Sequence, residues 1–173
     1  FARAGEEGAE ALIAQMIAAN AASERRAYRT ALARCPAAAG PLMHLLDDTR
    51  WFVVRNAVEL LDELGVREAE EKLMLALGHG DARVRKSAAA ALSRLGSARG
   101  IGALLPLLRD PNAAVRLQAV HALSAARNAR SVPALLQAQE REEDPEIQHA
   151  LVMALGAHPT DAAVERVVQL AQP

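Results

Sequence analysis

The side chains best suited to chemistry, the histidines and the cysteine, are scattered along the chain. None of the histidines stands in a His-Glu pair or an HExxH motif: His44, His79, His121, His149 and His158. Cys35 is the only cysteine, so it forms neither an internal disulfide nor a metal-binding cluster. Gly100 and Gly102 lie two residues apart, but no strand is expected before them, so they do not make a phosphate loop. We predict that the chain is not an enzyme and that it uses no metal and no cofactor.

Trp51 and Phe52 form an aromatic pair that indicates a site for binding a partner. Tryptophan and arginine are enriched among the residues that dominate binding energy at interfaces, and Arg55 follows one helical turn after the aromatic pair. Two interpretations stay open. Trp51 covers the junction with the N-terminal segment, or Trp51 and Phe52 form a binding anchor beside Arg55.

The elements that must position these residues repeat along the chain. An apolar pattern returns at a spacing of 31 residues: Val53, Ala57, Leu61, Leu64 and Gly65, then Val84, Ala88, Leu92, Leu95 and Gly96, then Val115, Ala119 and Leu123. A second pattern precedes each copy: Leu42-Met43, Leu73-Met74, Leu104-Leu105 and Leu135-Leu136. Apolar spacings of three and four residues, rich in alanine and leucine, predict helices and no strand. A period of this length is typical of stacked helical hairpins.

Helix ends are marked by residues with special backbone preferences. Gly65 and Gly96 follow apolar runs and are expected to end helices. Four short motifs are expected to open the helices that follow them: Asp81, Asp110-Pro111, Asp144-Pro145 and Thr160-Asp161.

These signals predict about eleven helices, or five and a half repeats, in one domain over residues 1–173. The expected segments are a degenerate N-terminal repeat, four regular repeats and a C-terminal capping helix, over residues 1–35, then 37–65, 67–96, 98–127 and 129–156, then 160–173. Because the chain starts at Phe1, we expect it to belong to a larger polypeptide of bacterial type.

The string LLRDPNAAVRLQAVHAL, residues 107–123, resembles the HEAT-repeat family, including the bacterial HEAT-like repeats first associated with bilin lyases. Pro106, inside a first helix, also resembles the family, in which that helix is often kinked. The resemblance implies an all-α, armadillo-like, right-handed α-solenoid with the second helix of each hairpin on the concave side. It also implies a ladder between repeats, in which Arg85 and Arg116 pair with loop aspartates such as Asp81 and Asp110. Because scaffolds, adaptors, lyases and nucleic-acid binders share this fold, the family does not decide the function.

The positions opposite the packing residues define the expected binding surface. Its side chains mix charge, aromatic rings and apolar groups: Trp51, Phe52, Arg55, Glu59, Arg83, Lys86, Leu117, His121, His149 and Met153. A mixed, partly apolar surface favours a protein partner.

Charge is segregated along the chain, although its net value is −1. Residues 81–130 hold nine lysines and arginines against two aspartates, and the segments on either side are acidic. This basic middle is a candidate for contact with phosphate groups or with an acidic protein. A nucleic-acid groove would need continuous basic rows with aromatic residues between them, whereas aromatic residues make up only 2% of the chain.

No apolar run approaches the ~20 residues needed to span a bilayer, and no signal peptide is visible. We therefore expect a cytoplasmic, non-catalytic scaffold or regulatory module that binds a protein on its concave surface and makes no membrane contact. The alternatives are nucleic-acid binding through the basic middle repeats and a bilin-lyase-like pigment chaperone.

Overall fold

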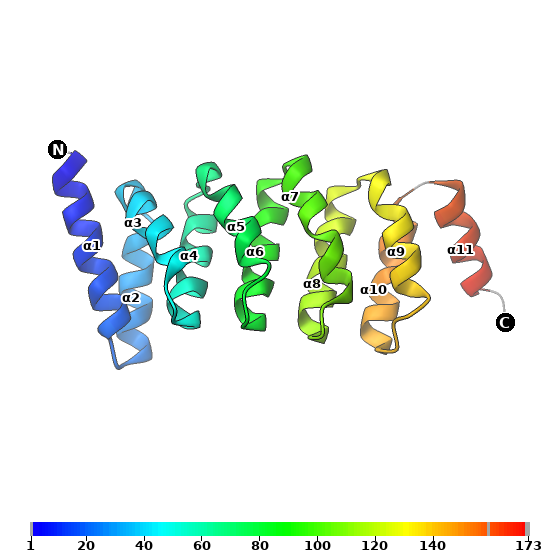
Figure 1. The fold of residues 1–173 in the computed structure, drawn as a ribbon, viewed down its shortest axis with the longest axis horizontal. Helices are drawn as coiled ribbons and strands as arrows, with labels where there is room; N and C mark the ends of the chain where they lie inside the picture. Colours follow the sequence, from blue (N-terminus) through cyan, green and yellow to red (C-terminus); the bar gives the residue numbers. More distant parts are fainter. Residues whose placement is uncertain (1, 159, 172–173) are drawn as a thin grey trace. The chain divides into compact units, whose positions relative to one another are not determined.

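A computed structural model describes residues 2–158 and 160–171 of the chain (Figure 1). Within these residues there are eleven α-helices, five short 3-10 helices and no strand. The all-α prediction is therefore confirmed. The helices form two compact units, residues 1–91 and residues 92–173.

The first unit alternates long helices with shorter, interrupted ones. Its long helices are α1 Ala2–Ala18, α2 Ala22–Leu32, α4 Trp51–Glu63 and the part of α6 Ala82–Leu95 that ends at Ala91. Its short elements are η1 Pro36–Ala38, α3 Ala39–His44, η2 Leu45–Asp47, η3 Arg67–Ala69 and α5 Glu70–Ala76. Helix α1 packs along α2, and the α3–η2 segment packs along α4.

The second unit repeats this alternation after the last residues of α6. Its elements are α7 Ala98–Ala103, η4 Leu105–Arg109, α8 Ala113–Ala126, η5 Ala129–Ser131, α9 Val132–Gln139, α10 Pro145–Gly156 and α11 Asp161–Ala171. Helix α8 packs against both η4 and α10, and α10 packs against α9 and α11. Helices α8 and α10 therefore each pack against elements that precede and follow them in the sequence.

The 31-residue register places the core. Val53, Val84 and Val115, equivalent positions in successive repeats, are each fully buried. Leu92 and Leu123 are fully buried as well, which confirms the predicted register. Burying a valine or leucine side chain contributes about 1.5–3 kcal/mol, so the repeated positions carry much of the stability.

Two helix ends follow the glycine signals and a third does not. Gly65 and Gly96 take φ values of 67° and 69° after α4 and α6, as predicted. The equivalent position after α8 is Arg127, which adopts φ 47°. A left-handed conformation costs an L-residue roughly 1–2 kcal/mol, so this end holds a strained arginine where the other two repeats have glycine.

The helix starts match three of the four expected motifs. Asp144 accepts hydrogen bonds from the backbone N–H groups of Glu146 and Ile147 and so caps α10. The prediction for Asp110-Pro111 was wrong by two residues, because α8 begins at Ala113 and is capped by Asn112. Asp110 instead accepts the backbone N–H of Asn112 at 2.9 Å and braces the capping residue.

Pro106 interrupts the first helix of its repeat, as the resemblance implies. The α-helical part of that helix, α7, ends at Ala103, and the 3-10 helix η4 follows over Leu105–Arg109. Proline lacks the N–H that an α-helical turn requires and clashes with the preceding turn. None of the helices in the described part of the chain is long and apolar enough to cross a membrane.

Candidate functional site

Trp51, at the start of α4, is half-buried and lies against an arginine from α6. The guanidinium carbon of Arg83 is 3.3 Å from the centroid of the Trp51 ring, within cation–π range. Arg55 approaches the same ring at 5.7 Å, and Phe52 meets it edge-on with centroids 6.0 Å apart. Phe52 is 38% exposed, so the cluster presents an aromatic surface at its edge.

Asp81 fixes the position of Arg83. Its carboxylate accepts the Arg83 backbone N–H at 2.9 Å, Nε at 3.0 Å and Nη2 at 2.7 Å. The hydrogen bond from the Arg83 side chain lowers the pKa of Asp81 to about 2. Asp48 holds Arg50 in the same way, and that pairing lowers the pKa of Asp48 to about 2. The ladder role predicted for Asp81 is corrected here, because Asp81 forms its ion pair with Arg83 in the same turn.

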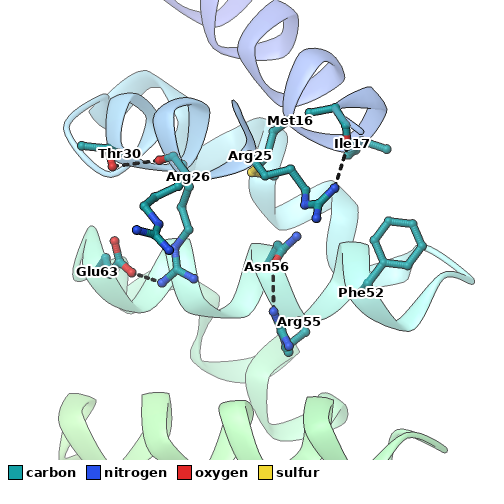
Figure 2. Close-up of a pocket in the computed structure, with 11 residues that line it drawn as sticks. Met16, Ile17, Arg25, Arg26, Thr30, Phe52, Arg55, Asn56 and Glu63 are labelled. Carbon is teal, nitrogen blue, oxygen red and sulfur yellow. Dashed lines mark hydrogen bonds and ion pairs between the residues drawn. The ribbon is translucent and has the colours of Figure 1, made fainter. Parts of the chain in front are cut away.

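A groove of about 770 Å³ opens where α1, α2 and α4 meet (Figure 2). Four arginines, one carboxylate, two other polar residues and four apolar residues line it: Arg25, Arg26, Arg29, Arg55, Glu63, Thr30, Asn56, Met16, Ile17, Ala19 and Phe52. Phe52 and Arg55 line the groove and also contact Trp51, so the groove and the aromatic cluster are continuous.

The arginine at the centre of the groove is neutralised within the chain. Arg29 donates to Glu59 at 2.6 Å and also to Glu63. Burial acts to lower the pKa of Arg29, but the hydrogen bonds and charges of the two glutamates raise it above its ordinary value. Ser87 on α6 donates to the second oxygen of Glu59 at 3.2 Å, so the glutamate is held from two helices.

The other arginines of the groove retain capacity to bind. Arg25 donates only to the uncharged backbone carbonyls of Ala19 and Asn20. Arg26 is exposed, and its guanidinium has no hydrogen-bond or ion-pair partner among the described residues. The Nε of Arg55 is buried and lies 3.4 Å from Glu59, close enough for charge attraction but without hydrogen-bond geometry. Nη2 of Arg55 reaches Asn56 only at 3.5 Å.

In the second unit, by contrast, the central arginine is part of the framework. Arg116 donates through Nε and Nη2 to the two carboxylate oxygens of Glu142 at 2.8 and 2.9 Å. The Glu142 side chain is only 7% exposed, and the hydrogen bond from Arg116 lowers its pKa. A ladder contact between repeats therefore exists at Arg116, but its acid is Glu142; Asp110 supplies a backbone carbonyl at 3.0 Å.

Arg85, the equivalent of Arg116 one repeat earlier, also holds its own loop. Its Nη1 donates to the carbonyl oxygens of His79 and Gly80 at 2.9 and 3.1 Å. Arg109 donates to Gln137 at 2.7 Å. Several side chains counted in the basic middle are thus engaged within the protein.

Comparison with known proteins places this arrangement in a family. A sequence profile for HEAT repeats matches residues 39–110, 69–156 and 101–172, well over half of the chain. The chain belongs to the HEAT-repeat family. No curated protein matches the sequence.

Solved structures agree with the HEAT-repeat assignment and with the α-solenoid fold class. The complex of CpcE and CpcF of phycocyanin lyase from Nostoc sp. PCC7120 is similar with a TM-score of 0.68 and 23% identity, over 94% of this chain and 69% of that chain. A designed armadillo repeat protein is similar with a TM-score of 0.57 and 19% identity, over 92% of this chain and 87% of that chain. A structure of computationally designed armadillo repeat proteins for modular peptide recognition is similar with a TM-score of 0.55 and 19% identity, over 91% of this chain and 86% of that chain. At these identities the likeness shows the fold.

The HEAT-repeat structure brings together half of the predicted surface residues. The first unit gathers Trp51, Phe52, Arg55, Glu59 and Arg83. Lys86, on α6, is exposed and makes no hydrogen bond or ion pair within the described part of the chain. In the second unit, His121 on α8 and both His149 and Met153 on α10 are exposed, whereas Leu117 is half-buried.

Sequence reasoning missed the α2 arginines of this HEAT-repeat chain. The poor match of residues 1–35 to the repeat pattern predicted only a capping role for them. A signal was present, because Arg25, Arg26 and Arg29 lie within one helical turn and therefore extend from neighbouring positions on one helix.

Proposed function

We propose that this HEAT-repeat protein is a non-catalytic protein-interaction module. A partner binds the surface of the second helices, which the family places on the concave side, with the Trp51 cluster as its anchor. The observation that carries this proposal is the stack of Arg83 on Trp51, bordered by the exposed ring of Phe52. A rigid aromatic group beside arginine is the composition of residues that dominate binding energy at protein interfaces.

Pre-organisation supports the same function. Asp81 holds Arg83 in place through three hydrogen bonds, so little side-chain freedom remains to be lost when a partner binds. Computationally designed armadillo repeat proteins for modular peptide recognition have a similar fold, which supports a peptide segment as the partner. A cytoplasmic location fits the unpaired Cys35, since reducing compartments keep thiols free.

Nucleic-acid binding through the basic middle repeats has less support. Arg83, Arg109 and Arg116 already hold side chains of this chain, which reduces the charge available to phosphates. The bilin-lyase-like alternative rests on the likeness of folds alone.

Selection from a displayed library of random linear peptides tests the proposal. Enriched peptides are expected to bind the wild-type chain. Their affinity for the Arg83→Gln variant, and for a double variant that carries Lys86→Glu and Leu117→Ala, is expected to be about 10-fold or more lower. Arg67→Gln is the matched control, because Arg67 is exposed at the start of η3 and does not line the groove. Circular dichroism and the melting temperature verify that each variant is folded.

Two results would contradict the proposal. One is that no peptide is enriched while a single-stranded oligonucleotide binds with a steep dependence on salt, the behaviour of phosphate recognition. The other is that enriched peptides bind Arg83→Gln and the Lys86/Leu117 double variant as well as they bind the wild-type chain.

A further inference from the structure

The groove between α1, α2 and α4 combines two kinds of surface (Figure 2). Ile17, Ala19 and Phe52 supply an apolar part, whereas Met16 is buried and offers almost no surface. Arg25 and Arg26 from α2 and Arg55 from α4 supply a cationic part. A ligand that fits both parts needs negative charge and an apolar group within a short distance of each other.

The charges of the groove do not cancel. Arg29 is matched by Glu59 and Glu63. Arg25 is bound only to neutral carbonyl oxygens, and Arg26 has no partner in the described part of the chain. The groove therefore holds a positive charge in excess, beside a buried Arg55 Nε–H group that has no acceptor in hydrogen-bond geometry.

We propose that this groove binds an acidic peptide segment of a partner protein, with one apolar side chain seated against Phe52 and Ile17. Carboxylates of the segment pair with Arg25 and Arg26 and reach the Arg55 guanidinium. Arginine suits this role because its planar fork of N–H donors matches a carboxylate with two parallel hydrogen bonds. The inference rests on the proposed function and names the chemistry of the partner.

A peptide fits these residues better than a nucleic acid does. Glu63 lines the groove, so a continuous phosphate backbone would meet a carboxylate there. Among the described residues that line the groove, Phe52 is the one aromatic residue, whereas single-stranded nucleic acids stack successive bases on several aromatic side chains. A peptide can place its apolar residue and its acids separately, which the mixed lining requires.

The probes are three short fluorescein-labelled peptides, measured by anisotropy at low ionic strength. The first has glutamates on both sides of a central leucine, the second has alanine in place of the leucine, and the third has lysines in place of the glutamates. We expect the glutamate–leucine peptide to bind most tightly, the alanine peptide several-fold more weakly, and the lysine peptide not at all.

Variants locate the binding. Arg26→Glu is expected to weaken the glutamate–leucine peptide at least 10-fold without lowering the melting temperature, because Arg26 is exposed and unpaired. Arg34→Glu is the matched control: Arg34 is also exposed, just after α2, and does not line the groove. Phe52→Ala is expected to weaken binding of the leucine peptide more than binding of the alanine peptide. The difference is the coupling between the change in the protein and the change in the peptide, and it measures the apolar contact.

Three outcomes would overturn the inference. Arg26→Glu and Arg34→Glu bind the peptide equally, or no glutamate peptide binds at all, or an oligonucleotide of equal charge displaces the peptide at lower concentration. If peptides from the random library depend on Arg83 but not on Arg26, the groove is not the site while the proposed function stands. If they depend neither on Arg26, nor on Arg83, nor on the Lys86/Leu117 pair, both proposals fail.

Discussion

The arginines of the first unit and those of the second unit are used in different ways. In the first unit, Arg83 lies on an aromatic ring, and the exposed guanidinium of Arg26 has no partner among residues 2–158 and 160–171. In the second unit, Arg116 is joined to Glu142, whose side chain is almost completely buried. The same residue type thus stacks on a ring or stays exposed in one unit and joins a buried carboxylate in the other.

This difference shows that a count of basic residues along a chain does not locate a binding surface. An arginine whose charge is matched by a buried carboxylate of the chain, such as Arg116, has less charge to offer a partner than Arg26, whose guanidinium has no partner among the described residues. The basic middle of the sequence includes arginines whose side chains bond to other residues of the chain, whereas the less regular N-terminal helices hold Arg25 and Arg26, which bind no carboxylate among the described residues. Each of the following changes tests one side of this comparison.

Loss of core packing should have the largest effect. Leu123→Ala removes a fully buried side chain from α8 and is expected to destabilise the protein by about 2–5 kcal/mol through the cavity left behind. Leu75→Ala is the control: Leu75 is 74% exposed, so its truncation should stay within about 0.5 kcal/mol. Urea titrations of both variants measure the difference. Equal stability of the two variants would be incompatible with the 31-residue register.

The framework role of Arg116 predicts the next largest effect. Glu142→Gln replaces a charge-assisted pair with a weaker one and should cost about 1–3 kcal/mol, whereas Glu140→Gln, at an exposed position nearby, should cost little. Because the native pKa of Glu142 is lowered, the pair stabilises the wild-type protein above the ordinary glutamate value of 4.5 and is lost as the pH falls through the lowered pKa. Melting temperatures of wild type and Glu142→Gln should therefore converge in acid. A constant gap down to pH 2 would rule out this pair as a source of stability.

The helix ends of the two units predict a smaller, opposite effect. Arg127→Gly relieves a left-handed arginine and should stabilise the protein by about 0.5–1 kcal/mol. Gly65→Ala, at the equivalent end in the first unit, should destabilise it, since Gly65 has φ 67°. Denaturant midpoints of the two variants should move in opposite directions. A lower midpoint for Arg127→Gly would show that the Arg127 side chain contributes more than its backbone strain costs.

The smallest effect on stability is expected at the Trp51 cluster. Asp81→Asn releases Arg83 from its carboxylate, and the emission of the only tryptophan should change while the unfolding midpoint moves little. The wild-type emission should shift in the same sense as the pH falls from 3.8 towards about 2, where Asp81 takes up its proton. Asp48→Asn is the control, because Asp48 holds Arg50, which lies near Phe52. Identical spectra for wild type and Asp81→Asn would mean that Asp81 does not position Arg83.

Most of the fold could be predicted from the sequence because its signals are local and repeated. Val53, Val84 and Val115 mark the same buried position in three successive copies, and Gly65 and Gly96 mark helix ends through a backbone conformation that glycine favours. Arg127 could not be predicted in the left-handed region, since nothing in its residue type requires it. Helix type and core register are therefore readable from spacing alone.

The candidate site was predicted only in part because it depends on contacts between distant side chains. Trp51 and Phe52 stood out because the repeat pattern does not require them, but the stack of Arg83 on Trp51 joins two helices. The partner of Arg116 was expected to be an aspartate, whereas the carboxylate that reaches it belongs to Glu142 in the next loop. The groove was missed because it is lined by the N-terminal helices, where the repeat pattern is weakest.

An NMR titration of the arginine Nε–Hε signals with the glutamate–leucine peptide tests the central claim most directly. If the groove of the first unit is the recognition site, the signals of Arg25, Arg26 and Arg55 should shift together and saturate at one dissociation constant, while the signal of Arg116 stays in place. A shift of Arg116 with unchanged signals from Arg25, Arg26 and Arg55 would contradict the account.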